Sequence, residues 1–474
     1  MNRTHVLHSL IILLFLSSAT VLCNLPYVSK YSLKMQFYLK EQRLSAVAQM
    51  TVTNTTGKPV SELPFLLYRL LNVTSVAAAG DIPLQFTQDI TSLSDEPTLQ
   101  TNAITVHLPS PLEPEQSMTL TMTYVGSIFG YPEVMAYVRD RIDEEYALVR
   151  PDAIAYPMLA EPSYQSYSNA QDGNYTYRCE VAVPEGYVVA CGGKLTNVER
   201  LNDTTTFVYE SKIPAWRMDI AAAKFVILKD EPRKLFMYAL PADSAGAVRV
   251  LKGMRDVIAF YSTVFGTVPN YQGYTAIEIP DGWGSQAGDY YFLQTSAAFT
   301  DSTRLHEVYH EIGHTWNVKP KPEIQRCRYF DEAFASYFEA LAVKEFEGYD
   351  AFLSQMQKSR ELFIRWANYD KQYSETPIVE YGKHELGRIS YTKGAWSLYV
   401  LHTLTGDDVF YSTIRKLLSD FEHHEADFKD FQTVTEQTSK LNLSKYFNEW
   451  FYGNESSRLL LENVPVDEMM KRYR

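Results

Sequence analysis

The run His306-Glu307-Val308-Tyr309-His310-Glu311-Ile312-Gly313-His314 contains two overlapping copies of the pattern His-Glu-x-x-His. Residues four apart on an α-helix share a face and lie one turn apart, so two such histidines can bind one metal ion. The glutamate beside them is placed to take a proton from water at that ion. Both copies satisfy this spacing, so the helix by itself leaves two metal-binding frames open.

A second helix downstream offers a third ligand. The second copy is followed by Trp316-Asn317, then by a loop through Lys319-Pro320-Lys321-Pro322, and then by an amphipathic segment over residues 329–338. Glu332 lies near the start of that segment. The helix-loop-helix path is expected to bring its carboxylate alongside the second copy.

Catalytic zinc commonly takes two histidines and one glutamate and leaves its fourth position to water. We therefore expect one zinc ion bound by His310, His314 and Glu332, with Glu311 as the general base. The remaining pair, His306-Glu307, is expected to be structural, with a supporting role of Glu307 behind a ligand as the less favoured alternative.

Length and charge limit the other function classes. The chain has 474 residues, 46% of them hydrophobic, which is enough for two or three packed domains. Its 57 acidic and 44 basic residues give a formal charge of −13. Such a charge repels phosphate backbones, so nucleic acid is not an expected partner. The oligomeric state is not readable from the sequence.

Residues 1–23 resemble a secretory signal, with a basic start, the short apolar run Leu10–Leu16 and a small-residue exit. We expect a secreted or extracytoplasmic protein. A membrane link is expected only through an uncleaved N-terminal anchor, for which the apolar run is short against about 20 residues, or through a lipid on Cys23.

The mature chain divides into two predicted domains. Residues 24–229 alternate apolar and polar side chains, which indicates strands with one buried face. Residues 230–474 show mainly helical spacing after a short β-rich part. We predict an α+β protein, an N-terminal antiparallel β-sandwich or saddle followed by a mainly helical domain.

Two cysteines lie symmetrically about the turn Pro184-Glu185-Gly186. A hairpin at this turn would place Cys179 opposite Cys191. A disulfide there suits an exported protein, so we predict that bond, with two separate buried thiols as the less favoured alternative.

The zinc segment resembles the gluzincin aminopeptidases of the aminopeptidase N and leukotriene hydrolase type. In that family a Trp and an Asn follow His-Glu-x-x-His, and the third ligand comes from an Asn-Glu-Gly-Phe-Ala-Ser-Tyr-like segment. This chain has Trp316-Asn317 and Asp331-Glu332-Ala333-Phe334-Ala335-Ser336-Tyr337. It departs by one residue fewer between His314 and Glu332 and by a shortened Trp-Phe-Gly-Asn. A loop can absorb this difference.

The resemblance extends to both domains. Tyr391-Thr392-Lys393-Gly394 is similar to the family's Tyr-x-Lys-Gly segment, which implies that the Tyr391 hydroxyl stabilises the oxyanion. Tyr156-Pro157-Met158-Leu159-Ala160-Glu161-Pro162 resembles the signature that closes the family's N-terminal saddle. The resemblance implies a thermolysin-like catalytic domain and a short member without the large C-terminal helical domain.

One family feature is missing. The family's Gly-Ala-Met-Glu-Asn stretch, whose Glu binds the substrate's free amine, corresponds here to Gly282–Tyr290, which contains no Glu. We expect Gly284, Ser285, Gln286, Ala287 and Gly288 to bind substrate, with glycine backbone approaching the peptide closely. Gln286 offers an amide in place of the carboxylate, and Asp289 is a weaker candidate for the amine.

Together these features predict a zinc metallopeptidase that acts on a peptide or protein substrate, most favourably as an aminopeptidase. Three alternatives stay open: an endopeptidase, a metal hydrolase for a non-peptide substrate such as an epoxide, and a catalytically silent relative that binds peptides. Residue preference and biological substrate are not readable from the sequence.

Overall fold

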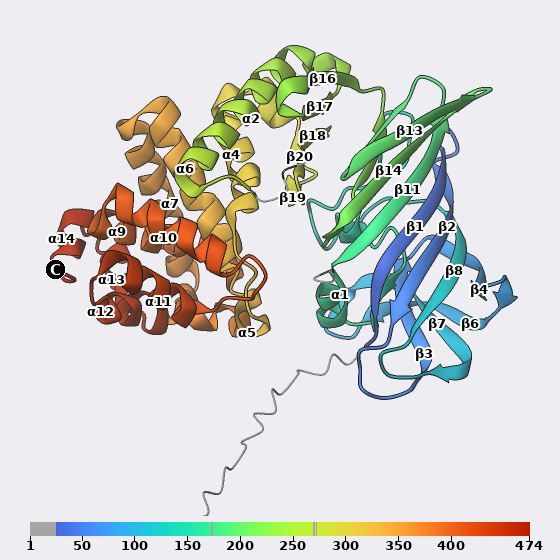
Figure 1. The fold of residues 1–474 in the computed structure, drawn as a ribbon, viewed down its shortest axis with the longest axis horizontal. Helices are drawn as coiled ribbons and strands as arrows, with labels where there is room; N and C mark the ends of the chain where they lie inside the picture. Colours follow the sequence, from blue (N-terminus) through green and yellow to red (C-terminus); the bar gives the residue numbers. More distant parts are fainter. Residues whose placement is uncertain (1–24, 172–173, 269–270, 272) are drawn as a thin grey trace, which may run out of the picture.

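A computed structural model describes residues 25–474 except 172–173, 269–270 and 272. The predicted signal segment, residues 1–23, lies outside the described residues. The chain forms a β-rich N-terminal domain and a mainly helical C-terminal domain, with a small sheet between them (Figure 1).

The largest sheet of the N-terminal domain has eight strands in the order β13-β14-β11-β1-β2-β8-β4-β5. Side chains alternate between buried and solvent-facing along β1, β2 and β11, as a sheet with one covered face requires. The pairs are antiparallel except β1 with β11, which run parallel. The strands are β1 (Tyr27–Tyr38), β2 (Arg43–Thr53), β4 (Leu71–Ala78), β5 (Ile82–Pro83), β8 (Ser117–Gly126), β11 (Tyr175–Pro184), β13 (Lys194–Leu201) and β14 (Thr204–Ala215).

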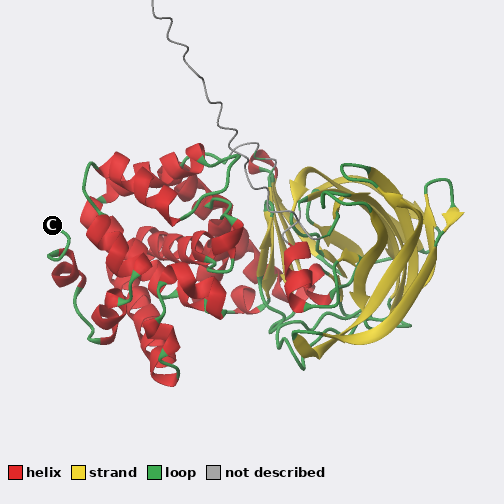
Figure 2. Ribbon diagram, turned by 90° about the horizontal axis from the view of Figure 1, so that it is seen from below, coloured by secondary structure: helices red, strands yellow, loops and turns green. Residues whose placement is uncertain are grey.

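Two smaller sheets complete this domain. One has the order β10-β3-β7-β6 and the other the order β12-β15-β9. The curved strands enclose a common apolar core (Figure 2). The predicted N-terminal β-sandwich or saddle domain is therefore confirmed, as a domain of several sheets. The strands are β3 (Val60–Tyr68), β6 (Gln85–Leu93), β7 (Glu96–Leu112), β9 (Ala147–Val149), β10 (Met158–Leu159), β12 (Val188–Cys191) and β15 (Ile220–Ala223).

The predicted disulfide is not present among the described residues. Cys179 and Cys191 are buried and free, with their sulfur atoms 3.7 Å apart, against about 2.05 Å for a bond. The predicted hairpin is also wrong, because β11 pairs with β1 and β14 while β12 pairs with β15 of another sheet. The cysteines therefore meet across an interface between two sheets. No backbone hydrogen bonds between β11 and β12 hold the two residues opposite each other, as they would in a hairpin.

A five-stranded sheet, ordered β16-β17-β18-β20-β19, opens the second half of the chain. Its first strand, β16 (Val226–Asp230), spans the predicted boundary at residue 230. β17, β18 and β20 run parallel, and the short β19 lies antiparallel at the edge. The other strands are β17 (Leu235–Ala239), β18 (Tyr274–Ile279), β19 (Gln286–Gly288) and β20 (Tyr291–Thr295).

Helices form the rest of this domain around one large apolar core. In α2, buried residues such as Val250, Met254, Val257 and Tyr261 recur every three or four positions, which gives one apolar stripe. The helices are α1 (Tyr164–Gln171), α2 (Ser244–Phe265), α3 (Ala297–Thr300), α4 (Leu305–Gly313), α5 (Pro322–Gln325), α6 (Phe334–Glu347), α7 (Tyr349–Tyr369), α8 (Gln372–Glu375), α9 (Lys393–Thr405), α10 (Asp407–Asp420), α11 (Phe428–Ser439), α12 (Ser444–Phe447), α13 (Glu455–Leu461) and α14 (Val466–Met470).

The two domains share a third apolar cluster. Residues of β9, β12 and β15 pack in it against residues of β17, β18 and β20. Trp283, just before β19, is buried in this cluster with its ring 5.5 Å from that of Tyr146. Burial of this kind fixes the small sheet against the N-terminal domain.

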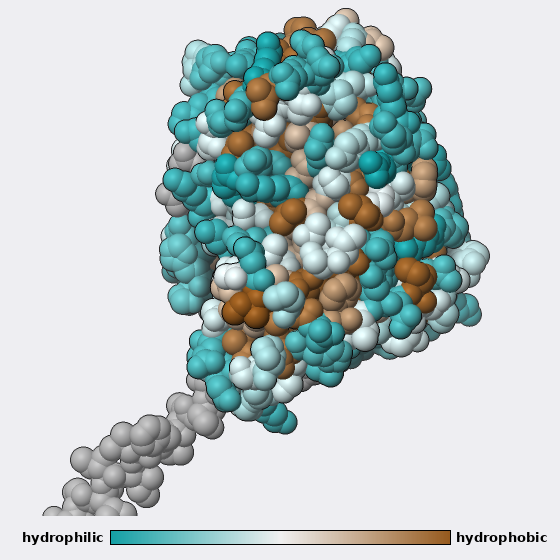
Figure 3. All heavy atoms as spheres, turned by 90° about the vertical axis from the view of Figure 1, so that its right-hand side faces the viewer, coloured by the Kyte–Doolittle hydropathy of each residue, from teal (hydrophilic) through white to brown (hydrophobic). Residues whose placement is uncertain are grey.

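The outer face of the N-terminal domain carries separate apolar groups among polar side chains (Figure 3). Single exposed apolar residues are ordinary on a protein surface. Across the described ranges, no helix combines the length and apolarity that a bilayer span requires.

Candidate active site

Helix α4 presents the predicted metal-binding histidines. Its apolar residues Val308 and Ile312 are buried in the catalytic core, which turns His310 toward the opposite side, and His314 begins the next 3₁₀ turn, η5 (His314–Trp316). A side chain at Gly313 would put Cβ 3.3 Å from the Ala335 Cα. Glycine therefore lets α4 pack closely against α6.

Glu332 lies in a π-helical turn, η6 (Tyr329–Ala333), that leads into α6. Turns of this kind often occur at functional sites. The Glu332 Oε2 atom is 3.2 Å from His310 Nε2 and 3.8 Å from His314 Nε2. One ligand atom from each of these three residues lies within 4.8 Å of the others, and they are the one such group found in the described part of the chain.

These separations fit a zinc ion. Ligand atoms about 2.0–2.2 Å from a tetrahedral zinc stand roughly 3.4 Å apart. Two imidazole nitrogens and one carboxylate oxygen are also a donor set that zinc prefers. His310, His314 and Glu332 are thus brought together as the sequence predicted, and they fit one zinc ion.

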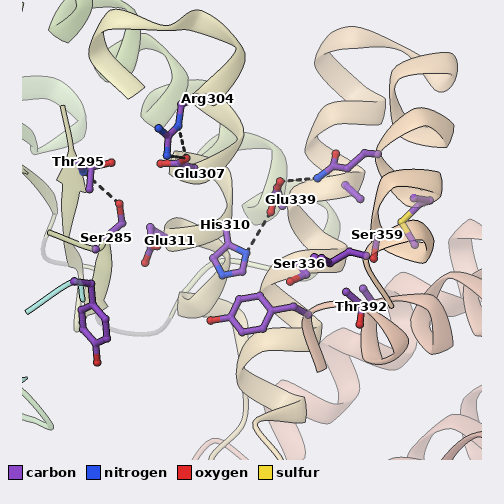
Figure 4. Close-up of a pocket in the computed structure, with 18 of the residues that line it drawn as sticks. Ser285, Thr295, Arg304, Glu307, His310, Glu311, Ser336, Glu339, Ser359 and Thr392 are labelled. Carbon is purple, nitrogen blue, oxygen red and sulfur yellow. Dashed lines mark hydrogen bonds and ion pairs between the residues drawn. The ribbon is translucent and has the colours of Figure 1, made fainter. Parts of the chain in front are cut away.

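Two carboxylates hold the ligand histidines from behind. Glu339 Oε2 is 3.2 Å from His310 Nδ1, and Asp331 Oδ1 is 2.6 Å from His314 Nδ1. Gln355 Nε2 in turn donates to Glu339 Oε1 over 2.5 Å (Figure 4). Such contacts orient the imidazole rings and raise their basicity as ligands.

Sequence reasoning missed this support. Glu339 follows Glu332 by two helical turns and so lies on the same face of the helix, a spacing that could have revealed it. Arg328, whose φ is +54°, contacts Glu332 Oε1 and donates to Asp331 Oδ2 over 3.1 Å. Burial opposes ionisation of Glu332, but Arg328 and the histidines hold the pKa of its carboxyl below the ordinary value.

Glu311 and Tyr391 lie beside this cluster. Glu311 is buried, and that burial raises the pKa of its carboxyl, although the two ligand histidines oppose the change. Tyr391 ends the 3₁₀ segment η8 (Gly387–Tyr391), and its ring stacks on His310 at 5.7 Å with planes 6° apart. Burial, together with the nearby Glu332 charge, raises the Tyr391 pKa, so the phenol stays a hydrogen-bond donor.

A cavity of about 590 Å³ opens on the cluster (Figure 4). His310, Glu311 and Tyr391 line it on one side, and Gly284 and Ser285 line it on the other. His310, Glu311 and Tyr391 therefore share with the Gly284–Ser285 segment a space large enough for a peptide fragment.

Only part of the predicted substrate-binding segment reaches the cavity. Gln286, Ala287 and Gly288 form edge strand β19 and are not among the residues that line it. Gln286 Oε1 accepts from Arg217 Nη1 at 2.8 Å. Asp289 Oδ2 accepts the Trp216 N–H at 3.3 Å. Both predicted amine contacts are therefore already used by the N-terminal domain.

The N-terminal domain holds this segment with two buried arginines. Arg150 Nη2 donates to the Trp283 carbonyl at 2.9 Å, and its Nη1 to the Gly284 carbonyl at 3.4 Å. Arg217 lies beside it and donates to Gln286. The buried partners that balance the two charges are Asp140, Asp152 and Asp219. No local pattern in the sequence signals these long-range contacts.

The first His-Glu pair does not join the metal cluster. His306 Nε2 instead lies 2.5 Å from Glu347 Oε1. Glu307 pairs with Arg304 and accepts a hydrogen bond from Gln294. The second copy of the pattern is therefore the one that converges on Glu332.

Comparison with known proteins agrees with this geometry. Residues 290–450 match the family model of the Peptidase family M1 domain. A search of curated proteins gave no match.

Several solved structures share the fold. One is a mutant M1 zinc metallopeptidase from Deinococcus radiodurans bound to a Tyr-Ser-Ala substrate, with a TM-score of 0.64, 16% identity and 90% of this chain and 94% of that chain covered. The unmutated enzyme from the same organism has a TM-score of 0.62 and 16% identity, with 92% of this chain and 94% of that chain covered. A two-domain M1 zinc metallopeptidase mutant bound to L-tryptophan has a TM-score of 0.62 and 15% identity, with 93% of this chain and 95% of that chain covered. The family model of the M1 peptidase domain thus matches residues 290–450, and the chain has the fold of the two-domain M1 zinc metallopeptidases.

Proposed function

We propose that this protein hydrolyses peptide bonds as a zinc metallopeptidase, with Glu311 as general base and Tyr391 as oxyanion donor. The observation that carries the proposal is the convergence of His310, His314 and Glu332 beside buried Glu311, where His310 and Glu311 line one cavity together with Gly284 and Ser285. A zinc ion held by these ligands would polarise the substrate carbonyl and lower the pKa of water.

The side chains around the ligands divide the remaining work. Glu311 accepts a proton from the attacking water and then delivers it to the leaving amine. The Tyr391 hydroxyl donates a hydrogen bond to the carbonyl oxygen as negative charge develops on it. The backbone at Gly284 and Ser285 supports an extended peptide beside the edge strand, in the manner of strand addition.

We further propose that the enzyme acts as an aminopeptidase, as its resemblance to the aminopeptidase N type implies. A second candidate, an endopeptidase, is favoured by one observation. The contacts expected to receive a free amine, Gln286 and Asp289, do not line the cavity and are engaged with Arg217 and Trp216 of the N-terminal domain.

The decisive test compares a dipeptide amide with its N-acetylated form. Faster hydrolysis of the free amine supports the aminopeptidase, and equal rates support the endopeptidase. Inertness toward both, in protein that holds one zinc per chain, would refute peptide hydrolysis and favour a non-peptide substrate. Zinc content near zero by elemental analysis would instead favour a silent peptide-binding relative.

We also retain export as a proposal, based on the signal-like residues 1–23. N-terminal sequencing of protein recovered from outside the cytoplasm tests it. A retained Met1 in cytoplasmic protein contradicts it.

A further inference from the structure

Glu307 belongs to the extra His-Glu pair and has no part in the proposed chemistry. It precedes His310 by three residues on α4 and lines the same cavity as His310 and Glu311. Figure 4 shows it on the side of His310 that faces Ser285 and Thr295. Its side chain is 33% exposed, so the carboxylate is accessible from the cavity.

Neighbouring side chains fix the direction of this carboxylate. Arg304 Nε donates to Glu307 Oε1 over 2.6 Å, and Gln294 Nε2 donates to Glu307 Oε2 over 3.0 Å. Gln294 is fully buried and also contacts Ser285 Oγ at 3.1 Å. A carboxylate offers about four acceptor positions. Oε2 accepts from Gln294 and keeps capacity for a further hydrogen bond in a preorganised position.

The charge of the cavity favours a cationic group. Four carboxylates line it, against one guanidinium and one imidazole. Two of the four have other tasks, since Glu311 is the proposed base and Glu339 holds His310. A cleft lined mainly by one sign of charge attracts the opposite sign. Glu307 and the exposed Asp281 remain as candidates to bind such a group.

We propose that Glu307 binds a primary ammonium group of the substrate and supplies the carboxylate that Gly284–Gly288 lacks. This inference rests on the proposed peptidase function and deepens it. The ammonium has two sources in a peptide, the free N-terminus and a lysine side chain. Glu307 is favoured over Asp281 because Arg304 and Gln294 hold its carboxylate in place inside the cavity.

Binding to inactive protein tests the inference without depending on turnover. In a Glu311→Gln background, calorimetry compares a free-amine tripeptide amide with its N-acetylated form. A second pair of N-acetylated peptides differs only by lysine against norleucine. We expect roughly tenfold tighter binding of at least one ammonium-bearing peptide than of its neutral partner, as a partly desolvated charged hydrogen bond gives.

Adding Glu307→Gln should bring that ratio near one, while Glu323→Gln on exposed α5 removes the same charge and should leave it unchanged. Loss of discrimination in the first pair identifies the N-terminus, and loss in the second identifies lysine. The inference is overturned if Glu307→Gln changes neither ratio, if it weakens charged and neutral peptides equally, or if Asp281→Asn abolishes the preference instead. Thermal melting and zinc content check that each variant is folded.

The inference and the proposed function fail differently. If the unmutated enzyme hydrolyses no peptide although Glu307-dependent binding persists, the peptidase proposal fails and the ammonium site stands. If peptides are hydrolysed and both binding ratios are insensitive to Glu307, the ammonium site fails and the peptidase proposal stands.

Discussion

The two walls of the cavity are built in different ways. The wall that carries the proposed chemistry comes from α4, η6, α6 and η8, all of which lie within residues 305–391 of the catalytic domain. The opposite wall, around Gly284 and Ser285, is held by Arg150 and Arg217 from the N-terminal domain. The proposed catalytic groups are thus positioned by local helix geometry, whereas the proposed peptide-binding wall is positioned by contacts between domains.

The largest expected effect tests the chemical wall. Glu311→Gln removes the proposed base but leaves the three ligand atoms in place, so kcat/KM should fall by about 10²–10⁴. Elemental analysis should still find one zinc ion per chain. Undiminished hydrolysis by this variant would refute the role of Glu311.

Arg150→Met tests the opposite wall. It would leave Asp140 buried without its ion-pair partner and would remove the donors to the Trp283 and Gly284 carbonyls. Breaking a buried pair from one side costs about 3–5 kcal/mol. Urea unfolding should show this loss, and KM should rise as the backbone wall loosens.

The same substitution at Arg200, which is exposed on β13, serves as the control. Arg200→Met should change the free energy of unfolding by less than about 0.5 kcal/mol. If Arg150→Met is equally mild, the buried Arg150 and its hydrogen bonds to the Trp283 and Gly284 carbonyls do not hold this wall.

Tyr391→Phe returns to the chemical wall with a smaller effect. Loss of one oxyanion donor should lower kcat about 10²-fold and leave KM nearly unchanged, because the hydrogen bond strengthens only in the transition state. Tyr381→Phe is a matched control, since its buried hydroxyl has no hydrogen-bond partner in the described structure. A rise in KM with an unchanged kcat would contradict the oxyanion role.

The smallest effect on hydrolysis is expected from a substitution in the five-stranded sheet next to the Gly284–Ser285 segment. Burial, reinforced by Asp243, raises the pKa of Glu278 on β18 from 4.5 to about 8. The folded protein therefore keeps this proton where the unfolded chain has lost it, and stability falls as pH rises from about 4.5 to about 8.

Glu278→Gln should remove this contribution, roughly 3 kcal/mol between pH 5 and pH 8. Thermal or urea unfolding at the two pH values measures it. An unchanged pH slope in the variant would show that Glu278 does not titrate in this range.

The metal cluster was predictable because its residues are close in sequence or on one helix face. Four-residue spacing placed His310 and His314, and the acidic start of the next helix supplied Glu332. Glu339 was detectable by the same periodicity but was missed. Strand alternation likewise gave the β domain, although it could not reveal that β1 and β11 pair in parallel.

The errors arose where residues far apart in the chain meet. The expected hairpin between Cys179 and Cys191 failed because β11 and β12 join different sheets. Gln286, expected in the substrate site, pairs with Arg217 instead. Neither partner could be inferred from neighbouring residues, because sheet packing alone sets both contacts.

The sequence by itself predicted the group His310, His314 and Glu332 that the fold brings together, and the order of a β domain and a helical domain, since helical and strand periodicities act over a few residues. Only the tertiary structure decided which part of Gly284–Gly288 faces the cavity and that Glu307 shares it with His310. These outcomes depend on how the two domains pack against each other, and that packing is set by apolar burial and by hydrogen bonds from buried Arg150 and Arg217 to residues 283–286, far along the chain.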